Sequence, residues 1–132
     1  MGACPRCEKM LEQAHPYFSV LWKTLKSEFP TVHISTTFRS EKDQEVAFQQ
    51  GRSRLHWDAS DHNRMDSSGK ECSRAIDLFE INKDGVAIWS HSQFFKIAEW
   101  LERNDYPVGS GIRWTKFKDG PHFFLLPFVS QP

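Results

Sequence analysis

The chain has 132 residues, and its 17 Lys and Arg balance 17 Asp and Glu, so the formal net charge is zero. This length suits a single domain, and a 39% hydrophobic content with 11 Phe and 5 Trp is enough for a compact core. Zero charge gives no support to non-specific nucleic-acid binding, which depends on Lys and Arg contacts with phosphates. No apolar run approaches the roughly 18 residues of a membrane-spanning helix.

Helical spacing of apolar residues predicts a first helix over 16–29. Alternating apolar residues then predict a strand over 32–38 with one buried face. Ser40 begins a second helix through a capping box, and Gly51 ends it. Residues 52–73 are polar without a sustained period, and loops of this length in compact domains are usually functional or disordered.

The second half of the chain alternates strands with one more helix. Apolar runs at 75–81 and 86–89 flank a turn signal and predict a hairpin. Ser90 begins a further helix through another capping box. After this helix we expect a strand over 112–117, a turn at 119–120 and a last strand over 122–126. This order predicts an α+β domain with a small, mainly antiparallel sheet.

The N-terminal segment and the cysteines indicate the cellular compartment. The first ten residues, MGACPRCEKM, lack the basic and apolar regions of a secretory signal, so we expect synthesis in the cytoplasm. Cys4, Cys7 and Cys72 are odd in number and do not make a disulfide framework, so we expect reduced thiols. The alternative is that Cys4 and Cys7 are half of a zinc site that Cys72 and one histidine would complete.

Three side chains indicate a possible metal site. His62 and His122 each lie where a polar loop meets a strand, and Asp77 lies in an apolar run where an unpaired carboxylate is unfavourable. Two imidazoles and one carboxylate form a three-ligand zinc site with an open position, and Asp119 would be its general base. The alternative is that Asp77 pairs with Arg74 or another arginine and that His122 only caps a turn.

Four motifs, in this order, resemble one known family over residues 35–126. It is the family of zinc D-alanyl-D-alanine carboxypeptidases and L-alanyl-D-glutamate endopeptidases of bacterial and phage cell walls, and the phage lysis endopeptidases look most similar. The motifs are Thr37-Phe38-Arg39-Ser40 with Gln44; Ser60-Asp61-His62-Asn63; Ser73-Arg74-Ala75-Ile76-Asp77-Leu78; and Trp114, Phe117, Asp119, Pro121, His122 and Phe123.

The resemblance implies a hedgehog-like, D-Ala-D-Ala-peptidase-like α+β fold. In it, 1–132 is a single zinc peptidase domain, and the role of 1–15 is open. It also implies one Zn²⁺ ion and a set of site residues. The implied metal ligands are His62, Asp77 and His122; the catalytic residues are Asp119, as base, and Arg39, as oxyanion or carboxylate clamp. Ser60 and Gln44 are candidates for binding substrate or for orienting the residues around the metal.

The implied activity is hydrolysis of peptidoglycan stem peptides by a monomer, as an endolysin-type L-Ala–D-Glu endopeptidase. The alternatives are D-Ala-D-Ala carboxypeptidase activity at the same site and a non-catalytic wall-binding module of the same fold. A small nuclease is disfavoured by the zero net charge. The resemblance further implies synthesis in a host bacterium and holin-mediated release to the wall, without membrane insertion.

One departure from the family pattern lies between the first two implied ligands. The separation of His62 and Asp77 is longer than usual, and residues 64–72 look like a polar insertion. Lengthening a loop is inexpensive, so we expect intact ligands but a reshaped cleft wall. A shorter alignment would place Lys70 at the histidine position, but a protonated amine is a poor zinc ligand. His62 is therefore preferred.

Overall fold

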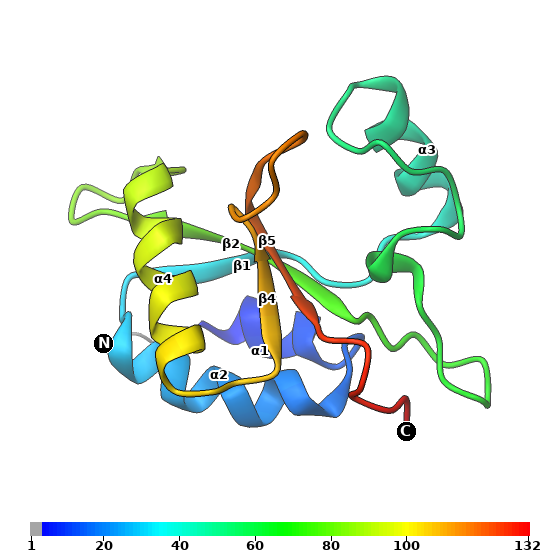
Figure 1. The fold of residues 1–132 in the computed structure, drawn as a ribbon, viewed down its shortest axis with the longest axis horizontal. Coiled ribbons are helices and arrows are strands. Elements are labelled where there is room, and N and C mark those ends of the chain that lie inside the picture. The colour runs from blue at the N-terminus through cyan, green and yellow to red at the C-terminus, as the bar shows by residue number, and fades with distance from the viewer. Residues whose placement is uncertain (1–3) are drawn as a thin grey trace.

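The computed structural model describes residues 4–132 (Figure 1). Within them, a sheet with the strand order β1-β2-β5-β4 is antiparallel throughout, and β3 pairs with β2. The expected α+β class is confirmed. No helix in this part of the chain is long and apolar enough to cross a membrane. The elements are α1 (Pro5–Leu11), α2 (Pro16–Glu28), β1 (Val32–Thr36), α3 (Glu41–Gln49), the 3-10 helix η1 (Asp61–Asn63), β2 (Ala75–Ile81), β3 (Ala87–Ile88), α4 (His91–Arg103), β4 (Val108–Gly111) and β5 (Asp119–Leu125).

The hydrophobic core lies between the sheet and three helices, α1, α2 and α4, while α3 stands apart on the far side of the β4–β5 tip (Figure 1). Side chains alternate between the two faces of a strand. Ile76 and Leu78 on β2 therefore enter the core, and Asp77 between them points to the other face. This alternation explains how a carboxylate occurs inside an apolar run.

Local capping signals were reliable guides to the helices. The Ser90 hydroxyl accepts a hydrogen bond from the Gln93 N–H at 3.4 Å at the start of α4, and the Ser40 hydroxyl accepts one from Asp43 at 3.3 Å at the start of α3. Gly51 follows α3 with a φ of +75°, a conformation that favours glycine. The predicted hairpin of β2 and β3 is also confirmed.

The expected strand over 112–117 is wrong, because the strand lies earlier, at Val108–Gly111. The two glycines of this segment, Gly109 and Gly111, are needed for close packing inside the sheet. A Cβ atom on Gly109 would lie 2.6 Å from the ring of Phe124. The last strand likewise begins at Asp119, three positions before its predicted start, so His122 lies within a strand and does not cap a turn.

The N-terminal segment contains a helix, α1, that the sequence did not indicate, and the expected reduced state of its cysteines is wrong. Cys4 and Cys7 form a disulfide, with Cα atoms 5.2 Å apart. Cys4 caps the start of α1, and this turn brings the two side chains together. Cys72 is free and buried, so for this residue the reduced state is confirmed.

A substitution at Gly111 tests how tightly the pairing of β4 with β5 fixes the position of Asp119. The two residues pair, and a Cβ atom on Gly111 would meet the Asp119 carbonyl and lie 3.0 Å from the Asp119 Cβ. Because backbone atoms cannot easily move away, we expect Gly111→Ala to lower the free energy of unfolding by about 1–3 kcal/mol. Denaturant unfolding measures this loss, with Thr115→Ala, in the exposed part of the connection, as control. Equal stability of the two variants would contradict the tight pairing.

Candidate metal centre

Three side chains from distant parts of the sequence converge on one point. His62 Nε2, Asp77 Oδ1 and His122 Nδ1 lie 3.2 Å from one another in each of the three pairs. Asp77 and His122 are direct partners across β2 and β5, so their side chains share one face of the sheet. The three residues that the sequence predicted as ligands are therefore brought together.

His62 is held in place by the polar turn around it. Ser60 caps η1, accepting a hydrogen bond from the His62 N–H at 3.1 Å, and Asn63 accepts one from the Ser60 N–H at 3.1 Å. The Arg39 N–H donates to the His62 carbonyl at 2.9 Å, which ties η1 to the segment after β1. The imidazole is only 2% exposed, so its position is fixed by packing as well.

The chemistry of these donors fits a metal ion. His62 Nδ1 lies 2.7 Å from the Thr37 carbonyl, which can only accept, so Nδ1 carries the proton and Nε2 presents its lone pair to the other two atoms. Tetrahedral zinc with bonds of about 2.0–2.1 Å spaces nitrogen and oxygen ligands about 3.3 Å apart. Burial raises the pKa of Asp77, but His62 and His122 outweigh it and hold this pKa well below its usual range. The carboxylate is therefore charged, as a ligand must be.

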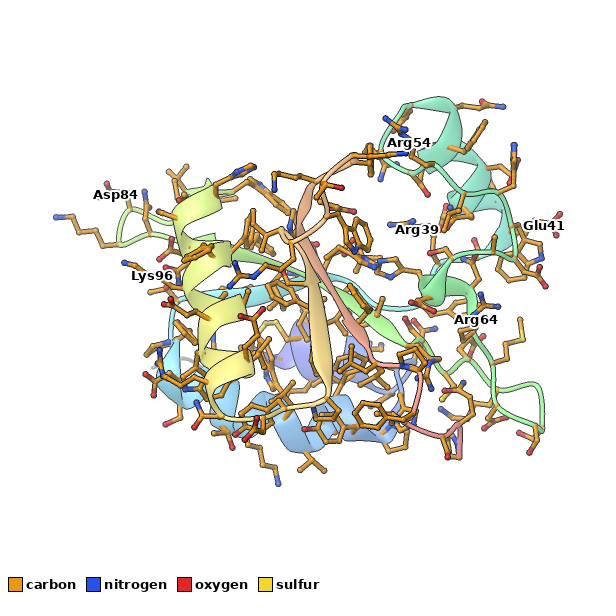
Figure 2. All side chains as sticks on the ribbon, viewed as in Figure 1. Arg39, Glu41, Arg54, Arg64, Asp84 and Lys96 are labelled. Atoms are coloured by element: carbon orange, nitrogen blue, oxygen red, sulfur yellow. A yellow bond between two sulfur atoms is a disulfide. The ribbon has the colours of Figure 1, made fainter. Side chains whose placement is uncertain are left out.

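Arg39 is the basic side chain beside the three candidate ligands. Its Nη2 lies 3.6 Å from Asp77 Oδ2, and its Nη1 donates to Gln44 Oε1 at 3.0 Å. Figure 2 shows it reaching from the segment before α3 toward the sheet. The alternative that Asp77 pairs with Arg74 is wrong, because Arg74 donates to the Leu126 and Val129 carbonyls near the C-terminus. Its other form, a pairing with another arginine, agrees with the contact between Asp77 and Arg39.

Gln44, a candidate for binding substrate, is instead completely buried and does not line the cleft. Its carbonyl accepts hydrogen bonds from Arg39 and from Asn63 at 3.0 and 3.2 Å, and its amide donates to the Leu55 carbonyl at 2.6 Å. It therefore positions Arg39 and η1. Ser60, the other candidate, lines the cleft but is 4% exposed and engaged with η1.

Gln44 gives a prediction that separates positioning from substrate contact. Gln44→Met keeps the volume but leaves the buried donors of Arg39 and Asn63 without their acceptor. We expect the free energy of unfolding to fall by about 1–3 kcal/mol, since unsatisfied buried polar groups are unfavourable. Gln49→Met, on the exposed side of the same helix, is the matched control in denaturant unfolding. A Gln44→Met variant as stable as its control would contradict the positioning role.

The ligands lie in a cleft of about 670 Å³, which Asp119 also lines. Burial raises the pKa of Asp119, and the neighbouring charge of Asp77 raises it further. A register shift between Ser110 and Gly111 lets Asp119 occupy the start of β5, three positions before His122, on the same cleft. The cleft therefore combines a candidate metal site with a carboxylate of increased basicity.

Aromatic side chains form one wall of this cleft. The ring of Trp114 packs against those of His122 and Phe124, with centroids 5.3 and 5.6 Å apart. The opposite wall is the loop after α3. Arg54 lies on this loop (Figure 2). Its guanidinium is 4.7 Å from the centre of the Phe117 ring, so a cation–π contact joins the two walls.

The polar insertion at 64–72 does not reshape the cleft, contrary to expectation. None of its residues lines the cleft. It folds on itself instead, through a bridge between Met65 and Glu71 and hydrogen bonds to Asp66. Lys70 donates to the Glu12 carbonyl at 2.7 Å, away from the ligands, so the alignment that uses His62 is the one that the structure supports.

Some site residues were not identified from the sequence. Asn63 is 3% exposed and connects η1 to Arg39 through its amide, which donates to the Arg39 carbonyl at 3.0 Å. Its position after His62 in the motif was a signal that could have been used. Arg54 and Phe117 could not have been paired in advance, because their contact depends on how the two cleft walls face each other.

No protein-family model matches the chain. The chain is 32% identical over 104 residues to the peptidoglycan L-alanyl-D-glutamate endopeptidase CwlK of Bacillus subtilis, covering 73% of this chain and 61% of the relative. The fold of this chain is similar to the crystal structure of the Serratia marcescens L-Ala D-Glu endopeptidase ChiX, with a TM-score of 0.72. The two chains are 25% identical, and the match covers 92% of this chain and 86% of the other. The chain thus spans about three fifths of the length of the curated relative, and it is similar to L-alanyl-D-glutamate endopeptidases both in sequence and in fold.

Proposed function

We propose that this protein, which is related in sequence and fold to L-alanyl-D-glutamate endopeptidases, is a zinc-dependent peptidase that cleaves the L-Ala–D-Glu bond of peptidoglycan stem peptides. The observation that carries the proposal is the convergence of His62, Asp77 and His122 at 3.2 Å, in a cleft that Arg39 and Asp119 also line. Two imidazoles and one carboxylate are a ligand set of catalytic zinc. When bound, the ion supplies Lewis acidity that makes water a stronger acid and polarises a carbonyl.

Asp119 is the general base in this proposal. It takes the proton of the attacking water and later passes it to the nitrogen of the leaving D-Glu residue. Its raised pKa supports both steps, because a more basic carboxylate accepts a proton more readily and still releases it to an amine. Trp114 and Phe124 give this side of the cleft an apolar wall.

Arg39 stabilises the negative charge that develops on the scissile carbonyl oxygen. Its guanidinium is 11% exposed and is held between Gln44 and Asp77, so it is already oriented before substrate binds. A planar, permanently charged group of this kind suits a developing oxyanion.

Digestion of a purified muropeptide with a full stem peptide tests the proposed bond. We expect mass spectrometry to show a fragment that ends in L-Ala and a peptide that begins with D-Glu. A chelator should abolish the cleavage, and added zinc should restore it. Release of D-Ala alone would show carboxypeptidase activity instead, and an intact muropeptide with zinc-loaded protein would support a wall-binding module.

The role in cell lysis is a finer proposal, and the resemblance of the motifs to phage lysis endopeptidases supports it. The protein is added to a suspension of purified walls and to a suspension of intact cells, and the loss of turbidity is followed in both. The difference between the two rates measures whether access to the wall limits the activity. Clearing of walls but not of intact cells would agree with a need for release across the membrane.

A further inference from the structure

A second group of potential metal ligands lies where the start of α1 meets β1. The sulfur atoms of Cys4 and Cys7 and Nδ1 of His33 lie within 4.8 Å of one another. None of these three residues lines the cleft, so this group is separate from the candidate catalytic centre. The sequence had suggested Cys72 and one histidine as partners of the two cysteines; the histidine is His33 on β1, and Cys72 is not part of the group.

The geometry of this group suits zinc once the disulfide is open. His33 Nδ1 lies 3.4 Å from Cys4 Sγ and 4.0 Å from Cys7 Sγ. Tetrahedral zinc with bonds of about 2.3 Å to sulfur and about 2.0 Å to nitrogen places such ligands about 3.5 Å apart. The imidazole nitrogen is therefore already at ligand spacing from Cys4 Sγ, and Cys7 Sγ has to move by a few tenths of an ångström as the two sulfur atoms separate.

The backbone around the sulfur atoms favours their charged form. The Ile34 N–H donates to Cys7 Sγ at 3.3 Å, and the Cys7 N–H donates to Cys4 Sγ at 3.1 Å. Hydrogen bonds to a charged group stabilise it. Cys4 lines a surface pocket, and a water molecule in this pocket is our candidate for a further ligand.

We propose that Cys4, Cys7 and His33 bind a zinc ion when the disulfide is reduced. In oxidising surroundings the S–S bond joins the two cysteines, and in reducing surroundings the ion joins them to β1. Disulfides rarely persist in a reducing cytoplasm, so the metal would connect α1 to β1 under those conditions. β1 leads directly to Thr37 and Arg39, and α1 already contacts that segment where the Thr37 hydroxyl donates to the Met10 carbonyl at 2.7 Å.

The chemistry is balanced by a dithiol reductant. The dithiol gives two electrons and two protons and becomes a cyclic disulfide, while the Cys4–Cys7 bond breaks to give two thiols. Zinc then displaces both thiol protons, which pass to solvent, and forms two bonds to sulfur and one to His33 Nδ1.

Cobalt(II) titration of the full chain tests the proposal, because thiolate ligands give Co²⁺ a near-ultraviolet charge-transfer band that imidazole and carboxylate ligands do not. One sample is reduced anaerobically with an immobilised dithiol, which is then removed, and the other keeps its disulfide. We expect the reduced chain to bind one additional equivalent of Co²⁺ with the thiolate band, and zinc to displace it. Equal stoichiometry in both samples, or no band after reduction, would overturn the proposal.

Single variants identify the ligands and separate this site from the cleft. Cys7→Ser and His33→Ala should each weaken the band at a given Co²⁺ concentration by about tenfold or more, and His33, being partly exposed, is the safer change for folding. Cys72→Ser should keep the full band, and loss of the band there would show a wrong ligand set. His62→Ala should also keep it, so a failure of the proposed catalytic function would leave this result intact.

Discussion

Asp119→Asn is expected to lower the rate of muropeptide cleavage by about 10²–10⁴-fold, the usual contribution of a general base. The amide keeps the size of the carboxylate but cannot accept the proton of the attacking water. Asp119 is not one of the three donors that converge at 3.2 Å, so metal content should be unchanged. Initial rates by chromatography and zinc content by elemental analysis measure the two effects on the same sample.

Asp84→Asn is the matched control for this experiment. Asp84 is exposed in the turn between β2 and β3, at the end of the molecule opposite α3 (Figure 2). The Asp84→Asn variant should cleave the muropeptide at the same rate as the unchanged protein. An Asp119→Asn variant that retains full activity would remove Asp119 from the mechanism, whereas one that loses its zinc would show that this carboxylate is a ligand.

His62→Ala is expected to remove the zinc ion and, with it, nearly all activity. The variant keeps Asp77 and His122 but loses the Nε2 atom that lies 3.2 Å from both, and two ligands hold zinc far less tightly than three. Elemental analysis after dialysis measures the content. The disulfide form of the chain should be used, so that Cys4 and Cys7 contribute no thiolates.

His56→Ala is the control for the loss of zinc. His56 also lies in the polar loop, but it is exposed, pairs with Glu45 at 2.8 Å and stacks on Phe48. Its removal should leave the zinc content unchanged. Unchanged zinc in the His62→Ala variant would contradict the ligand assignment and reopen the alignment across the insertion.

The sequence predicted well those elements whose formation depends on residues close together in the chain. The capping residue Ser90 and the regular apolar face after it predict α4 because both act within one helix. The hairpin of β2 and β3 was predicted for the same reason. The strand at Val108–Gly111 was missed because its glycines respond to Phe124 and Asp119, which approach from β5 and are invisible in the local pattern.

The site shows the same division. The motifs around His62, Asp77 and His122 indicated the ligands one by one, and Arg39 and Asp119 followed from their positions in those motifs. The burial of Gln44 was not foreseen, and the expectation that the insertion at 64–72 reshapes the cleft wall was wrong. Both depend on which neighbours a segment meets after folding. The same holds for the disulfide between Cys4 and Cys7, which required the unpredicted helix α1.

The amino-acid sequence by itself determined the class of the domain and the types of ligand available, because capping, periodicity and motif chemistry act over a few residues. Only the tertiary structure decided that three donors lie 3.2 Å apart and that His33, not Cys72, faces the cysteine pair. These are distances between residues up to 60 positions apart in the chain. They depend on strand pairing and on packing against the core, which no local pattern contains.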